Sequence, residues 1–123
     1  MDERFAKGLE LFNEGEYFDC HEVIEDLWLE TASNDMYRDL YKGVIQAAAA
    51  IYQWDRGILT GARGLYAGAV GYLEKYRPRA LGLDVEKMVN DLKACFRPLE
   101  TWDGQAQTPR SKAQTPVLRY EAA

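Results

Sequence analysis

Histidine and cysteine are scarce in this sequence, and their scarcity excludes several kinds of site. There is one histidine, His21, and there are two cysteines, Cys20 and Cys95, among 123 residues. A single histidine cannot complete an HExxH zinc motif or the paired Glu-x-x-His motifs of a di-iron bundle. The cysteines fall in predicted helices without a CxxC spacing, so we expect them to be buried, reduced thiols with a structural role.

Long hydrophobic runs and an excess of basic residues are also missing. No apolar stretch approaches the roughly 18 residues of a membrane span. The start, MDERFAKGLE, lacks the basic end and apolar core of a signal peptide. We therefore expect a cytoplasmic protein with no membrane partner. The net charge of -5 disfavours broad contact with phosphates, so no nucleic-acid partner is expected.

Hydrophobic residues make up 47% of the chain, and they recur at the 3.6-residue period of helices. The pattern predicts an all-α, five-helix bundle of two antiparallel helical hairpins plus a capping helix, within one domain covering residues 1–100. Residues 101–123 contain Pro109 and Pro116 and are predicted to form an extended or partly disordered C-terminal tail. The predicted helices cover residues 2–14, 16–32, 35–56, 58–76 and 85–97.

Glycine, proline and a capping aspartate mark the ends of these helices. Gly15 and Gly57 can supply the left-handed residue that follows a helix, and the short connections there favour antiparallel neighbours. Asp84 is a good N-cap for the fifth helix. Pro78 and Pro98 are expected to end the fourth and fifth helices, respectively.

The two predicted hairpins share a weak internal repeat, offset by the 42 residues from Gly15 to Gly57. In it, Gly15-x-Tyr17-x-x-Cys20-x-x-x-Ile24 matches Gly57-x-Leu59-x-x-Ala62-x-x-x-Tyr66. This alternation of glycine, large and small residues resembles a tetratricopeptide-like repeat. The position of His21 is occupied by Arg63 in the second copy, and a departure from a packing pattern is a place where function can lie.

One face of the predicted fourth helix is rich in glycine. Each interior glycine costs a helix about 1 kcal/mol relative to alanine, so a whole face of glycines requires a compensating gain. Close packing against the third helix or another subunit is one explanation, and a groove that admits a ligand is the other. The residues assigned to packing or to such a groove are Trp28, Gly61, Gly64 and Gly68.

His21 and Glu25 are four residues apart on the second predicted helix, so their side chains can meet. They fall in the gap between two apolar strips, whereas Glu22 projects about 100° away. Three interpretations stay open. The pair could be a buried polar contact that fixes helix packing. His21 and Glu25 could be two ligands of a metal site. They could also form a binding or catalytic site with Arg38 or Gln46 opposite.

Several stretches together resemble a known family. The runs FNEGEYFDCHEVIEDLW, GVIQAAAAIY and RGILTGARGLY are similar to a small bacterial and archaeal family known as domain of unknown function number 309. Its members share a glycine-plus-aromatic turn, an HE-x-x-E-x-x-W helix, a G-x-I-Q-x-A helix and a G-x-x-x-G-A helix start. The resemblance covers roughly residues 5–76 and implies an all-helical bundle without implying an activity. It groups as one cluster His21, Glu22, Glu25, Arg38 and Gln46.

These observations favour a binding or interaction module that uses the polar cluster between the second and third helices, or the glycine face. Its partner would be a small polar ligand or a protein, and a homodimer would suit the apolar girth of the third helix. No cofactor is expected. The alternative hypothesis is a hydrolase in which His21 is a general base or a metal ligand.

Overall fold

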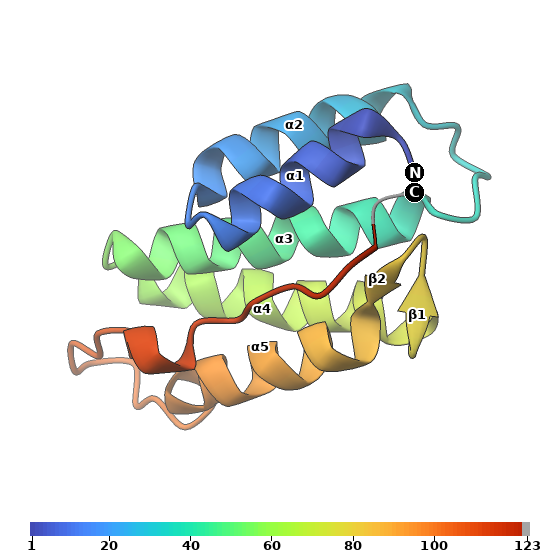
Figure 1. Ribbon diagram of the computed structural model, residues 1–123. Helices are drawn as coiled ribbons and strands as arrows, with labels where there is room; N and C mark the ends of the chain where they lie inside the picture. The colour runs from blue at the N-terminus through green and yellow to red at the C-terminus, as the bar shows by residue number, and fades with distance from the viewer. Residues whose placement is uncertain (122–123) are drawn as a thin grey trace.

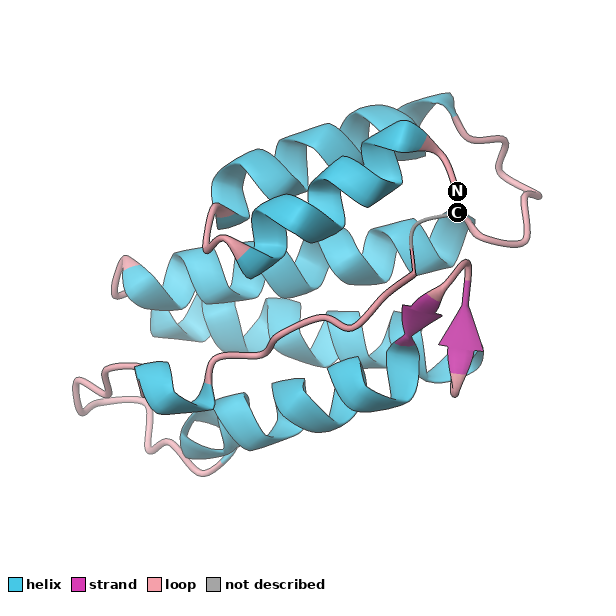
Figure 2. Cartoon of the chain, in the orientation of Figure 1, coloured by secondary structure: helices cyan, strands magenta, loops and turns pink. Residues whose placement is uncertain are grey.

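Five α-helices lie side by side in the computed structural model, which describes residues 1–121 (Figure 1). The all-α bundle predicted from the sequence is confirmed, and Figure 2 shows how little of the chain is strand. The middle helix of the chain packs against both of its sequence neighbours, and the last helix packs against the fourth. The helices are α1 (Glu3–Asn13), α2 (Tyr17–Glu30), α3 (Arg38–Asp55), α4 (Leu59–Leu73) and α5 (Val85–Glu100).

The turn between α1 and α2 has the same geometry as the turn between α3 and α4. Gly15 and Gly57 both have φ of +80°. In each turn the glycine N–H donates three residues back and the next N–H donates five residues back, at 2.9 to 3.0 Å. These two hydrogen bonds define a Schellman motif, in which a left-handed residue lets the following N–H groups bond to the last carbonyls of a helix. The prediction that these glycines end the first and third helices is confirmed.

Three predicted helix ends were wrong. The third helix begins at Arg38, because the Asp35 carboxylate accepts the Tyr37 N–H at 2.8 Å and holds residues 35–37 in a turn. The α-helical part of α4 ends at Leu73, and a tighter 3₁₀ turn, η1 (Glu74–Tyr76), follows it.

The fifth helix does not end at Pro98. Proline removes only one hydrogen bond, to the carbonyl of Ala94, and Ala94 is exposed to water that can replace the donor. The fully buried Leu99 keeps the final turn against the core. Asp84 caps the start of α5 as predicted, accepting the Lys87 N–H at 2.9 Å.

A small hairpin precedes α5, between the predicted helices 58–76 and 85–97. Strands β1 (Arg79–Ala80) and β2 (Leu83–Asp84) pair antiparallel, with Gly82 at φ +78° in the turn. The second strand also forms a bridge from Leu83 to Tyr120 in the tail. The outer edge of β2 is therefore paired rather than open to solvent.

Aromatic residues from the second hairpin and α5 meet in the core. The Tyr66 and Phe96 rings are stacked with centroids 4.5 Å apart, and Trp54 lies 4.9 Å from Phe96. Such contacts add to the burial of apolar area, which contributes roughly 25 cal/mol per Å². The largest fully buried side chains are Phe5, Phe12, Phe96, Leu9, Ile24, Leu40, Ile51, Leu73, Leu83, Met88, Leu92 and Leu99.

The predicted tail is extended and lies along the bundle between α1 and α5, as Figure 1 shows in red. Its only regular element in the described part is a single 3₁₀ turn, η2 (Lys112–Gln114). Leu118 is 4% exposed, so the tail contributes to the core. Residues 122 and 123 of the predicted tail lie outside the described residues.

None of the helices within residues 1–121 is both long enough and apolar enough to cross a membrane.

Candidate functional site

His21 and Glu25 lie on the face of α2 that borders α3. The His21 Nε2 atom is 3.4 Å from a Glu25 carboxylate oxygen, and its Nδ1 atom is 3.3 Å from the carbonyl oxygen of Phe18. The histidine side chain is 29% exposed, so the pair is neither sealed in the core nor fully solvated. Both ring nitrogens face acceptors within α2, and a neutral imidazole can donate to only one of them.

This geometry bears on the hydrolase hypothesis. A general base or a metal ligand needs a ring nitrogen with a free lone pair directed at the substrate or the ion. In this side-chain conformation, each ring nitrogen of His21 already faces an acceptor of α2. Within residues 1–121, no group of three or more histidine, cysteine or acidic side chains is placed to hold a metal ion.

Two cations of α3 lie over the ring of Trp28. The Arg38 guanidinium carbon lies 4.1 Å from the centre of the indole ring, and the Lys42 ammonium lies 4.3 Å from it. Cations over an aromatic face are attracted to its negative quadrupole. Arg38 also donates to the carbonyls of Trp28 and Thr31, at 3.4 and 3.0 Å, and so satisfies the end of α2. Arg38 is therefore engaged with Trp28 and the end of α2, not with Glu25.

Gln46 lies on the α4 side of α3. A side chain added at Gly68 would collide with its amide, so Gly68 leaves the room that the Gln46 side chain occupies. The Gln46 amide oxygen is buried and has no hydrogen-bond partner within the described residues. Leaving such an atom unpaired is costly, which makes Gln46 a group that would gain from a donor.

The remaining predicted residues lie outside these contacts. Gly64 is exposed, with no heavy atom within 4 Å of the place a Cβ would occupy, and a Cβ at Gly61 would meet only the Ile58 side chain, at 3.3 Å. Glu22 is exposed, on the outer side of α2. The structure thus brings together His21 with Glu25, Trp28 with Arg38, and Gln46 with Gly68, in three adjacent groups rather than in one pocket.

The two thiols are structural. Burial raises the pKa of Cys20 to about 12 and the pKa of Cys95 to about 11, because the charged thiolate loses its hydration. Both cysteines are free and buried. Neither is a nucleophile at neutral pH.

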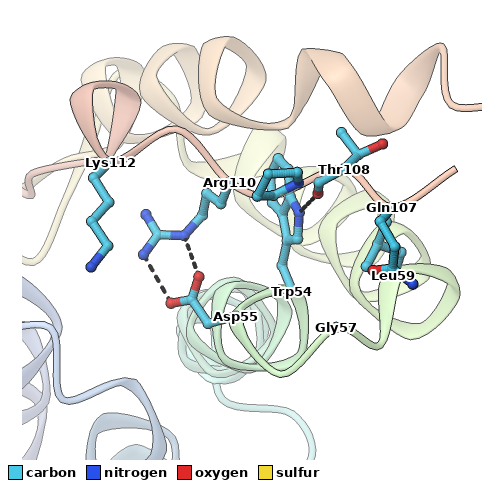
Figure 3. Close-up of a pocket in the computed structure, with 9 residues that line it drawn as sticks. Trp54, Asp55, Gly57, Leu59, Gln107, Thr108, Arg110 and Lys112 are labelled. Atoms are coloured by element: carbon cyan, nitrogen blue, oxygen red, sulfur yellow. Dashed lines mark hydrogen bonds and ion pairs between the residues drawn. The ribbon is translucent and has the colours of Figure 1, made fainter.

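A cavity that the sequence did not indicate lies at the end of the bundle where both hairpins turn (Figure 3). Its volume is about 430 Å³, and it is bounded by the end of α3 and by residues 107–112 of the tail. The Arg110 guanidinium makes two 2.9 Å bonds to the Asp55 carboxylate. The indole N–H of Trp54 donates to the Thr108 carbonyl at 2.6 Å. No spacing rule links positions 55 residues apart, so local pattern gave no signal for this contact.

Lys112 extends beside Arg110 in this cavity, and its side chain makes no bond to the other residues shown there (Figure 3). All three nitrogens of Arg110 make hydrogen bonds, since the third donates to the Thr115 hydroxyl at 2.8 Å. Its side chain is only 6% exposed. The Arg110–Asp55 pair therefore fastens the tail to α3 rather than offering a free charge to a ligand.

These features define an all-helical bundle with a polar and aromatic surface seam along α2 and α3 and a tail bound along its opposite side. The chain belongs to the family described as "Domain of unknown function (DUF309)", whose model matches residues 5–65. It is also 32% identical over 88 residues to "Uncharacterized protein YpuF" from Bacillus subtilis (strain 168). That alignment includes 70% of this chain and 50% of the relative, so the chain spans about half the length of that protein.

Proposed function

We propose that this protein is an interaction module that binds an acidic helical segment of a partner protein. The binding face consists of the outward side of α3 around Lys42 and Gln46, bordered by Trp28 of α2 and by the glycine side of α4. The observation that carries the proposal is the pair of cations on Trp28, neither of which is bonded to a carboxylate within the described residues. A carboxylate from a partner would complete both interactions.

The charge along this face supports an acidic ligand. Although the chain carries a net charge of -5, the outward side of α3 presents Arg38 and Lys42, and Arg56 follows at the end of the helix. Arg56 rests on the ring of Tyr52, with 5.3 Å between its guanidinium carbon and the ring centre. Local charge of one sign steers a ligand of the opposite sign, and salt weakens the attraction.

The glycine side of α4 supports a helical ligand. Gly64 and Gly71 have open space where side chains would be. A helix in a partner can approach such a surface closely, and its apolar residues can then contact aromatic side chains beside it. Phe18, which is 45% exposed and packs against Tyr52, is one such aromatic residue at the α2 border.

A selection from a display library of helical peptides tests the proposal. We expect the selected peptides to carry a stripe of glutamate or aspartate and to bind more weakly as salt is raised. Lys42→Glu should weaken binding at least tenfold by fluorescence anisotropy. The matched control is Lys7→Glu on α1, which makes the same charge change at an exposed lysine away from this face. Equal weakening by both variants, or selection of peptides without acidic residues, would contradict the proposal.

A further inference from the structure

The tail is bound to the bundle through its backbone. At Leu118, the Asn13 side chain at the end of α1 donates to the carbonyl at 2.9 Å and accepts the N–H at 2.7 Å. An amide side chain that makes both bonds replaces the pairing that a neighbouring strand would provide. Asn13 thus binds both backbone groups of one residue, and the side chain at that position takes no part in these two bonds.

The opposite side of the tail is bound in the same way. The N–H of Asp84 donates to the Arg119 carbonyl at 2.9 Å, and the N–H of Glu121 donates to the Gly82 carbonyl at 3.0 Å. The Lys87 ammonium donates to the Val117 carbonyl at 2.7 Å. The tail therefore adds a strand to the edge of β2, which is a common mode of peptide recognition.

Side chains of the tail alternate between the bundle and solvent. Pro116 and Leu118 are buried and Tyr120 is half-buried, whereas Val117 and Arg119 are exposed. An extended segment places successive side chains on opposite sides, so one of its two faces enters the channel between α1 and α5. The channel accordingly has positions for a proline, a leucine and a tyrosine at every second residue.

We propose that this channel is a binding site for extended segments of other proteins that carry the pattern Pro-x-Leu-x-Tyr, and that residues 115–121 are an intramolecular occupant that competes with them. All five hydrogen bonds go to tail backbone atoms, so a segment from another chain can make every one of them. Residues 111–114, which directly precede this occupant, are exposed. The site is on α1, α5 and β2, so it is independent of the face proposed for acidic helices.

A labelled peptide with the sequence of residues 115–121, TPVLRYE, tests the site in the full-length chain. Leu118→Asp should release the tail, because a carboxylate cannot remain in an apolar position. We expect the peptide to bind this variant at least tenfold more tightly than it binds the wild-type chain. Adding Asn13→Ala should reverse the gain by at least tenfold, and adding the control Asn90→Ala, at an exposed position of α5, should not. Equal binding to wild type and Leu118→Asp, or indifference to Asn13→Ala, would overturn the proposal.

A second measurement leaves every contact residue intact. A protease site replaces residues 111–114, which are exposed and follow the Arg110 anchor, and cleavage turns the occupant into a separate peptide on an otherwise complete chain. We expect the cleaved protein to keep its helical circular dichroism and to exchange its fragment for the labelled peptide. Loss of helical signal on cleavage, or a fragment that never exchanges in excess peptide, would show that the tail is a fixed part of the fold and would overturn the proposal.

Discussion

The two helical hairpins bury side chains at the same positions, but their exposed positions have different neighbours. Each begins its second helix after a glycine at φ +80°. At the next three equivalent positions both copies are buried, with Tyr17, Cys20 and Ile24 in one and Leu59, Ala62 and Tyr66 in the other. Packing therefore explains why the repeat persists at these positions despite the change of residue type.

The exposed sides have different neighbours. His21 contacts Glu25 on its own helix, whereas the equivalent Arg63 lies 5.2 Å from the ring of Trp102 and donates to its carbonyl at 3.5 Å. The same position thus borders the α2–α3 seam in one hairpin and fixes the start of the tail in the other. Equivalent buried positions stay buried in both copies, whereas equivalent exposed positions differ in their contacts. The two copies can therefore acquire separate roles.

The shared interior is tested most strongly at Ile24. Ile24→Ala should lower the free energy of unfolding by about 2–5 kcal/mol, because it removes a fully buried side chain of α2 that packs against α1 at Gly8. Urea denaturation followed by circular dichroism measures the change. Leu29→Ala on the same helix is the control, since Leu29 is 66% exposed and a surface change is typically within about 0.5 kcal/mol. A similar cost for both would mean that α2 is not packed as described.

Gly8 faces Ile24 across the contact between α1 and α2, so added bulk at Gly8 should disturb the first hairpin. A Cβ at Gly8 would collide with Ile24, so Gly8→Ala should destabilise the chain by about 1–3 kcal/mol. Combining it with Ile24→Ala should cost less than the sum of the two single changes, since the second removes the obstructing atoms. Strict additivity in urea denaturation would show that the two residues do not touch.

The shared turn predicts equal effects in the two hairpins. Gly15→Ala and Gly57→Ala should each cost about 1–2 kcal/mol, because both sites have φ of +80° and alanine is strained there. Open space surrounds both glycines, so no steric contact adds to the cost. Thermal unfolding of the two variants should therefore shift by the same amount, and a difference of more than about twofold would break the equivalence.

The glycine side of α4 gives the smallest effect, with the opposite sign. Gly64→Ala should stabilise the protein by about 1 kcal/mol, since alanine favours a helix interior and nothing lies within 4 Å of the new carbon. The same variant should weaken binding of a selected helical peptide if the partner approaches this surface closely. Stabilisation without any change in peptide binding would remove Gly64 from the proposed face.

The sequence predicted the parts of the structure that depend on neighbours along the chain. Helical period, the glycine turns and the Asp84 cap are local signals, and each appears in the structure. The end of α5 was misjudged because burial of Leu99 outweighs the one bond lost at Pro98. Helix geometry also identified the contact of His21 with Glu25, which are four residues apart.

Contacts between distant segments had no such signal. The pairing of Arg110 with Asp55 and that of Asn13 with Leu118 depend on how the tail returns across the bundle. The engagement of Arg38 with Trp28 likewise depends on how α2 and α3 are aligned against each other. For this reason, the candidate residues were predicted as one cluster and are found in three adjacent groups.

The bond between Asn13 and Leu118 joins positions 105 residues apart in the chain. A ribosome makes the first of these residues long before the second, so one side of α1 stays uncovered until residue 118 has emerged. Contacts of such long sequence separation also form late, since the connecting loop must be closed first. The N-terminal helix, although made earliest, is thus among the last elements whose surroundings are completed.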